Sequence, residues 1–296
     1  MAFTAKTDYG TIVAAKLRSQ VVYEELFGAA YKGDIAAAAV NIPVQDDATV
    51  ADYNPSNLGA NTVTYAGNKH ILADINWDRF ISQYLDGFDI NAAGYGAKAA
   101  ALEEVAKAIA KDINDKAIKT LLYGAQGKDK TNTAAFADTF RTGKTGSVKS
   151  NGAGDVYDTL SDLAADLTTA GVPMDGRYIV VNGTGLAEIM KSSKTIRQGD
   201  LAQSLVEKGF VAQIAGFNVK VSNAVTGNVT VGGASKAIWG VVGHPDFACA
   251  PEGFRAEPVL EGTQGNGNAV GGAFAKTRVA FTFEVIDPRA FGILAA

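Results

Sequence analysis

The chain has 296 residues but a single cysteine, Cys249, so an internal disulfide is impossible. One thiol and no disulfide framework are typical of proteins that fold in a reducing compartment. Histidine is also scarce: His70 and His244 lie far apart and in no metal-ligand spacing such as HExxH. These scarcities argue against a disulfide-stapled secreted scaffold and against a histidine-based centre, and we expect no bound metal.

Long hydrophobic and long basic runs are absent as well. No apolar stretch approaches the roughly 18 residues that a membrane span needs, and the opening MAFTAKTDYG lacks the apolar core of a signal peptide. The formal net charge is -4, so wrapping of nucleic acid along the whole chain is not expected. With 47% hydrophobic and 20% charged residues, the composition is that of a folded chain of one large domain or two small ones.

No catalytic or cofactor motif is complete. Residues 143–145 spell the GKT of a phosphate loop, but the position of the required first glycine is Asp138, whose carboxylate would repel phosphate. Residues 183–185 lack the third glycine of a dinucleotide fingerprint, and no GxSxG elbow occurs. The aspartates between 155 and 166 recur at helical spacing, which favours a solvated face over a metal site. Cys249 is expected to be a small buried thiol. We therefore predict no enzyme activity, no catalytic residue and no cofactor.

One long helix is the clearest element that is present. The pattern predicts it from about residue 90 to 123, about 50 Å long at 1.5 Å per residue, with Asp89 or Asn91 as its cap and Gly124 as its stop. Glu103 and Lys107 form a favourable i,i+4 pair. The apolar face is expected to comprise Leu102, Ala106, Ile109, Ile113, Ala117 and Leu121.

An extended segment precedes this helix. Strands are expected at 40–44 and 49–53, a turn at 54–59, and alternating apolar residues from Val63 to Trp77. Because a half-buried strand needs a surface to lie against and none is obvious within the chain, we predict that residues 46–86 form a two-stranded arm that packs on an adjacent copy. The candidate intersubunit contacts are Asn54, Pro55, Asn57, Leu58, Lys69 and Trp77.

The remaining elements follow in a fixed order. An amphipathic helix is expected over 9–31, and a mainly loop segment with a short strand over 125–154. Asp155 should cap a helix that buries Val156, Leu160, Leu163 and Leu167. A strand at 177–181, a helix at 184–191 and two strands within 209–223 complete an α/β unit. From residue 237 the chain is β-rich, and its last strand pattern places Val279, Phe281, Phe283 and Val285 on one face.

This order of elements resembles the major capsid proteins of tailed bacteriophages with the Hong Kong 97-type fold. The phrases that carry the resemblance are YKGDI at 31–35, HILADINW at 70–77 running into FDI, VPMDGRYIVV at 172–181, GFVAQIAGFNV at 209–219 and FEVIDP at 283–288. The resemblance implies an α+β capsid fold with an N-terminal arm (1–45), an extended β-hairpin loop (46–88), a peripheral domain with the spine helix (89–153 and 232–296) and an α/β axial domain (154–231).

The resemblance also implies a function. Such a chain would be a major capsid protein whose many copies form pentamers and hexamers of an icosahedral head, in a virion assembled in the host cytoplasm. Its partners would be a portal and packaged double-stranded DNA bound without sequence specificity, and no membrane. Relatives can carry an additional N-terminal scaffolding region, whereas this chain begins at the arm, so a separate scaffolding protein or a cleaved precursor is implied, and Met1 favours the former. Lys69 lies where some relatives crosslink covalently, but no acceptor or catalytic acid can be identified, so no crosslink is inferred.

Two alternatives remain open from the sequence. The first is the shell of a bacterial encapsulin-type nanocompartment, which shares the fold; the long arm with its Pro/Asn-rich tip favours the virus. The second is an α/β enzyme or small-molecule binding protein, which electron microscopy would separate from a shell protein at once.

Overall fold

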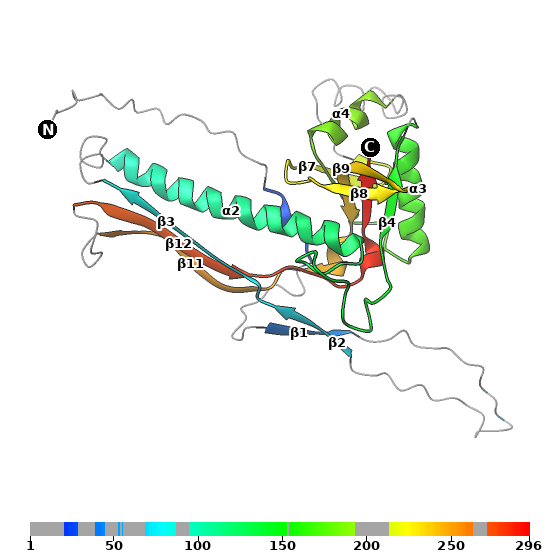
Figure 1. Cartoon of the computed structure of the whole chain (residues 1–296), viewed down its shortest axis with the longest axis horizontal. Helices are drawn as coiled ribbons and strands as arrows, with labels where there is room; N and C mark the ends of the chain where they lie inside the picture. The colour runs from blue at the N-terminus through cyan, green and yellow to red at the C-terminus, as the bar shows by residue number, and fades with distance from the viewer. Residues whose placement is uncertain are drawn as a thin grey trace.

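The computed structural model describes residues 21–28, 39–44, 53, 55, 69–86, 95–152, 154–192, 213–262 and 271–296. A long helix lies over a three-stranded sheet, an α/β lobe stands at the C-terminal end of that helix, and a two-stranded ladder lies beyond the sheet (Figure 1). The helices are η1 (Tyr23–Glu25), α2 (Tyr95–Ala125), α3 (Val156–Thr169), α4 (Gly183–Lys191), η4 (Pro245–Phe247) and η5 (Pro288–Ala290). The strands are β1 (Ala39–Val44), β2 (Lys69–Asp74), β3 (Trp77–Leu85), β4 (Ser147–Ser150), β5 (Tyr178–Val181), β6 (Gln213–Ile214), β7 (Phe217–Val221), β8 (Asn228–Val231), β9 (Ala234–Gly243), β10 (Ala248–Cys249), β11 (Glu252–Gly262), β12 (Ala273–Phe281), β13 (Glu284–Val285) and β14 (Gly292–Ala295).

Helix α2 confirms the predicted long helix, but its buried face and its ends differ from the predicted ones. Ile109, Ile113, Ala117 and Leu121 are buried as expected, but Ala106 is exposed and Val105 is buried in its place. The buried residues recur every four positions, and each such step rotates the stripe by about 40° around the helix. The buried face therefore turns along α2, as packing on a twisted sheet requires.

The ends of α2 differ from the expected ones. The helix continues through Gly124 to Ala125. A Cβ at Gly124 would lie 2.5 Å from the side chain of Val285, so this glycine permits close packing and does not terminate the helix. Asp89 and Asn91, the expected caps, lie outside the described residues. The Glu103–Lys107 ion pair is present.

The sheet below α2 has the antiparallel order β11-β12-β3. Here the sequence-based interpretation was wrong, because it placed residues 77–85 in an arm without a partner in the chain. All nine residues of β3 pair with β12, from Trp77 opposite Phe281 to Leu85 opposite Ala273. Arg79 on the inner face of β3 pairs with Asp112 of α2 at 3.1 Å. The alternation of this strand is thus satisfied within one chain.

The α/β lobe is built on a seven-stranded sheet of order β4-β14-β9-β5-β7-β6, with β8 paired to β9. Helix α3 begins as expected: Asp155 accepts a hydrogen bond from the Tyr157 N–H at 2.8 Å. Its predicted apolar face is confirmed, since Val156, Leu160, Leu163 and Leu167 are all buried. Strands β5, β6 and β7 and helix α4 also form where they were predicted. However, β4, β9 and β14 join this sheet from outside residues 154–231, the range expected for the unit.

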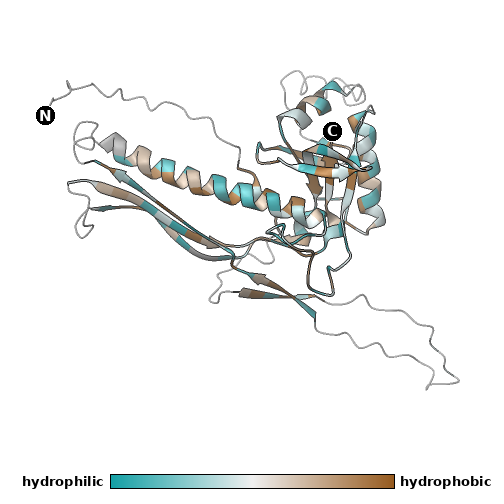
Figure 2. Cartoon of the chain, in the orientation of Figure 1, coloured by the Kyte–Doolittle hydropathy of each residue, from teal (hydrophilic) through white to brown (hydrophobic). Residues whose placement is uncertain are grey.

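One continuous hydrophobic core joins the lobe to the C-terminal half of α2. Figure 2 shows hydrophobic residues concentrated in the strands of the lobe, with hydrophilic residues interrupting the surface of α2. The expected last strand is divided: β12 ends at Phe281, and β13 pairs with β10 in a separate sheet. Val279, Phe281, Phe283 and Val285 therefore do not share one strand, although all four are buried in this core. Within the described part of the expected 9–31 helix, only η1 is helical; Leu26 and Phe27 are buried there, and the rest of that prediction lies outside the described residues. None of the helices in the described ranges combines the length and hydropathy that crossing a bilayer demands.

Candidate assembly site at the base of the arm

The described part of the arm is the ladder of β1 and β2, here called the arm base. The two strands pair antiparallel over six positions, with Ile42 opposite Ile71, and form a sheet separate from the other sheets of the described residues. Of the candidate contacts, Lys69 begins β2 and is half-buried, and Pro55 is an exposed turn residue. Asn54, Asn57 and Leu58 lie outside the described residues.

Trp77 occupies a different place from the one expected. It is the first residue of β3, not part of the arm, and its ring centroid lies 5.7 Å from that of Phe281 and 6.1 Å from that of Phe283. The ammonium of Lys116 lies 5.9 Å from the same indole ring. These contacts give Trp77 a packing role inside the subunit.

A small apolar cluster joins the arm base to the body. Ile42, Ile71 and Ala73 of the arm are fully buried against Cys249, with Phe140 and Ile286 packed alongside. Burial, and after it the charge of Glu284, raises the pKa of the Cys249 thiol to about 12. The thiol is therefore protonated and unreactive at neutral pH, as expected of a buried core residue. On the opposite face of β2, Leu72 is 54% exposed.

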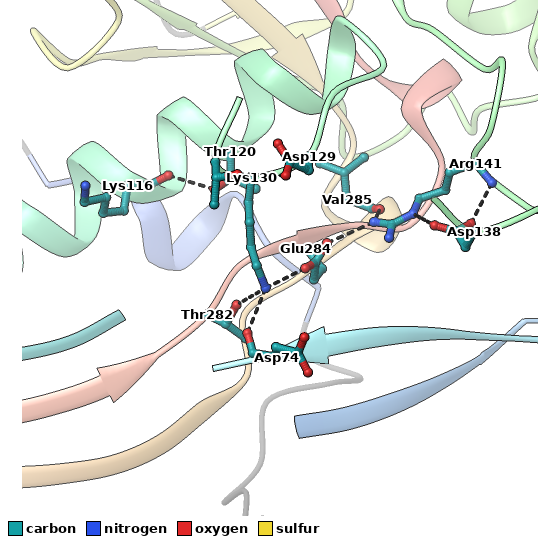
Figure 3. Close-up of polar contacts among 11 residues, drawn as sticks. Asp74, Lys116, Thr120, Asp129, Lys130, Asp138, Arg141, Thr282, Glu284 and Val285 are labelled. Atoms are coloured by element: carbon teal, nitrogen blue, oxygen red, sulfur yellow. Dashed lines mark hydrogen bonds and ion pairs between the residues drawn. The ribbon is translucent and has the colours of Figure 1, made fainter. Parts of the chain in front are cut away.

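Beside this cluster lies a buried ionic network centred on Lys130 (Figure 3). The Lys130 ammonium donates to the main-chain oxygen of Asp74 at 2.7 Å and to Thr282 Oγ1 at 2.8 Å. It also pairs with Glu284 Oε1 at 2.6 Å. The three protons of the ammonium thus serve three acceptors, one of which is the last residue of the arm base.

Arg141 completes the network on the other side of Glu284. Its guanidinium donates to Glu284 Oε2 and to the main-chain oxygen of Val285, both at 2.9 Å, and to Asp138 Oδ2 at 2.7 Å. The same group lies 4.2 Å from the ring centroid of Phe136. Lys130, Arg141 and Glu284 are all less than one-tenth exposed. Two cations face two carboxylates, so the network is electrically balanced.

A cavity of about 360 Å³ lies next to this network, between the arm base and the loop that follows α2. Leu72 and Asp74 line one side of the cavity, and Ala134, Phe136 and Asp138 line the other. On this side the arm base is therefore not held by close packing. Among the described residues, no group of three or more His, Cys, Asp or Glu side chains is placed to hold a metal ion.

Sequence reasoning missed the network. It treated Asp138 only as the residue that spoils a phosphate loop, whereas the structure makes it the partner of Arg141. The lysine of that GKT, Lys144, lies with its ammonium 3.6 Å from the Phe140 ring centroid and 3.9 Å from Asp287. The sequence contained no signal of this network, because Glu284 alternates with Thr282 on the side of the strand pattern where polar, solvated residues are expected.

Asp287, at the edge of this region, should make stability depend on pH. Burial acts to raise its pKa, but hydrogen bonds from Arg289 and the charges of Arg289 and Lys144 outweigh it, so the pKa is lowered. A lowered folded-state pKa means that the contribution is present above the unfolded value of about 3.9 and is lost as pH falls through the folded value. Asp287→Asn should cost about 1.5–3 kcal/mol at pH 7, and the difference from the unaltered chain should shrink below pH 4. Denaturant unfolding between pH 3 and 7 measures it. Asp162→Asn, at an exposed position of α3, is the control; a constant Asp287→Asn difference across that range would contradict the assignment.

Comparison with solved structures identifies the fold of this chain. The structure superposes on a chain of Mycobacterium phage Che8 with a TM-score of 0.68 and 17% identity, over 99% of this chain and 97% of that one. The capsid structure of the cyanophage P-SCSP1u gives 0.75 and 14%, over 98% and 92%. The capsid of a native GTA particle gives 0.68 and 12%, over 99% and 95%. These likenesses define the fold as that of phage capsid proteins, the Hong Kong 97-type α+β fold expected from the sequence.

The family itself follows from the sequence. The family model described as phage capsid protein matches residues 88–293, and the chain belongs to that family. No curated protein matches the chain. The protein is a major capsid shell protein and thus a component of the virion, and the encapsulin-type alternative is not favoured.

Proposed function

We propose that many copies of this chain assemble as pentamers and hexamers into an icosahedral phage head that encloses double-stranded DNA. The observation that carries the proposal is the arm base. A two-stranded ladder is marginally stable alone in water, and this one packs one face on the body while Leu72 on the other face is exposed. A neighbouring subunit would supply the missing surface for the arm, and each arm would find such a neighbour in a closed lattice.

The other parts of the proposal follow from the same architecture. We assign α2 with the β11-β12-β3 sheet to the peripheral domain and the seven-stranded lobe to the axial domain. The net charge of -4 suits a container for DNA, since a polyanion is not trapped on an acidic wall. A separate scaffolding protein and a portal would act during assembly in the host cytoplasm. The protein would carry out no catalytic turnover.

Removing the arm tip tests the proposal. Deletion of residues 54–59 should leave the thermal unfolding of the isolated subunit unchanged, because Pro55, the described residue of the tip, is exposed. Under conditions in which the unaltered chain forms shells, the deletion should abolish closed shells in electron micrographs and in light scattering.

A second variant distinguishes the contribution of the tip's side chains from that of its length. Residues 54–59 replaced by six glycines and serines keep the length but remove Asn54, Asn57 and Leu58, and shell formation should again fail. Loss of subunit folding in either variant would show that the tip belongs to the core. An unaltered chain that stays monomeric at high concentration would contradict the proposed function itself.

A further inference from the structure

Lys130 is an unusual link between the arm base and the rest of the chain. Its ammonium contacts three separate places in the sequence: Asp74 at the end of β2, Thr282 just after β12, and Glu284 in β13. A lysine on a surface moves freely, whereas this one has every proton engaged and is nine-tenths buried. Thr282 and Glu284 of the body therefore hold the Lys130 ammonium in place, in position to donate to Asp74 of the arm base.

The Asp74 main-chain oxygen lies at the end of the arm base, where the chain passes into the body. Beyond it, Ile75 and Asn76 alone separate the arm base from β3, whose nine residues are locked to β12. The contacts of the arm base with Cys249, Phe140 and Ile286 are apolar, and apolar contacts have little directionality. The cavity beside Asp74 leaves room for the ladder to shift. A hydrogen bond, in contrast, weakens steeply when its angle changes.

We infer that Lys130 is a positioning residue, which holds the arm at the angle that assembly needs through its hydrogen bond to Asp74. Glu284 holds Lys130 in place, and Arg141 holds Glu284 through its second oxygen. The link from arm angle to assembly rests on the proposed function, whereas the effect on the arm angle itself does not. The Arg141 guanidinium donates to Asp138, Glu284 and Val285, none of which belongs to the arm base, so this residue supplies a matched control.

Two double variants separate positioning from simple stabilisation. Lys130→Met with Glu284→Gln removes the contact with Asp74 and keeps the remaining Arg141–Asp138 pair balanced. Arg141→Met with Asp138→Asn removes the other cation together with its own carboxylate, and leaves the Lys130–Glu284 pair and the hydrogen bond to Asp74 intact. Both variants lose one buried cation and one carboxylate of the network, and they differ in whether the arm keeps its hydrogen bond.

The measurement is the distribution of distances between spin labels at His70→Cys on β2, which does not line the cavity, and Asp162→Cys on α3, in the free subunit. Both positions are exposed, and the native Cys249 is fully buried and should not be labelled. The distribution should broaden by about twofold or more in the Lys130 variant, because a single directional contact has been lost. It should stay as narrow as in the unaltered chain in the Arg141 variant. The yield of closed shells should fall with the Lys130 variant well below that with the Arg141 variant.

Equal distance distributions in the two variants would overturn the inference, and so would a broad distribution in the unaltered subunit. Should the Lys130 variant fail to fold, Lys130→Arg provides the second test: it keeps a cation that can donate to Asp74, and it should restore a narrow distribution. A broad distribution with Arg at this position would also overturn the inference. Failure of the unaltered chain to form shells would instead contradict the proposed function, and the distances would still report on the arm.

Discussion

Ile113→Asp is expected to unfold the subunit. Ile113 is 4% exposed and lies in the core that joins α2 to the lobe. A carboxylate placed there without a partner costs several kcal/mol through desolvation, a large share of the roughly 5–15 kcal/mol by which domains are stable. The loss should appear as insoluble protein on expression, and as the absence of a cooperative thermal transition in any soluble fraction.

Lys111→Ala, two residues away, is the matched control. The side chain of Lys111 is 48% exposed and pairs with Asp115 at 2.7 Å. Exposed pairs of this kind contribute about 0.3–0.5 kcal/mol, so soluble yield and the thermal transition should hardly change. Equal loss of soluble protein in both variants would show that the side of α2 assigned to the core is incorrect.

Glu284→Ala should have the second-largest effect. It leaves the cations of Lys130 and Arg141 buried, with the main-chain oxygens, Thr282 and Asp138 as their remaining partners. Removing one partner of a buried ion pair costs about 3–5 kcal/mol, because the other charge stays out of water without compensation. Denaturant unfolding monitored by circular dichroism gives this difference as a shift of the midpoint at unchanged slope.

Glu261→Ala tests whether burial is the cause. Glu261 also pairs with a lysine, Lys276 at 2.5 Å, but its side chain is 59% exposed. A surface pair contributes about 0–1 kcal/mol, so this variant should unfold near the midpoint of the unaltered chain. If the two glutamate variants shifted the midpoint equally, the buried network would contribute no more than a surface ion pair.

The elements that the sequence predicted well are those specified by local pattern. Helix α3 has a capping aspartate, Asp155, and four apolar residues at helical spacing, and all of these act as predicted. Strand β5 is a run of β-branched and aromatic residues, and it is buried along its whole length. In both cases the information lies within about fifteen residues, which is the range over which periodicity can be detected.

The errors arose where the structure depends on contacts between residues that are far apart in the sequence. Strand β3 finds its partner, β12, about 200 residues later, and alternation alone cannot show whether a partner lies in the same chain or in another. The placement of Val105 in the core, in place of Ala106, depends on how the sheet turns beneath α2. Gly124 matched a helix stop by composition, but its role depends on Val285.

The candidate site was predictable only in outline. The sequence identified an arm and its first strand, and the tip residues Asn54, Asn57 and Leu58 stay predictions. The network at the arm base could not be predicted, because Lys130 and Thr282 are 152 positions apart and Arg141 and Glu284 are 143 apart. A buried lysine cannot be told from a solvated one by spacing, since only the folded chain shows which acceptors surround its ammonium.

The place of β14 has a consequence for the order of events during synthesis. Residues 292–295 form an inner strand, parallel to β4 on one side and antiparallel to β9 on the other. Until residues 292–295 have been synthesised and have left the ribosome, β4 and β9 lack the strand that joins them, and the sheet of the lobe stays open between them. Closing the sheet pairs β14 with β4, which lies almost 150 positions earlier in the chain, and such long-range pairing is slow. Unpaired strand edges are open to association with other chains in the meantime. In a cell that makes many copies at once, each nascent subunit therefore passes through an interval in which its lobe can still join the wrong strand.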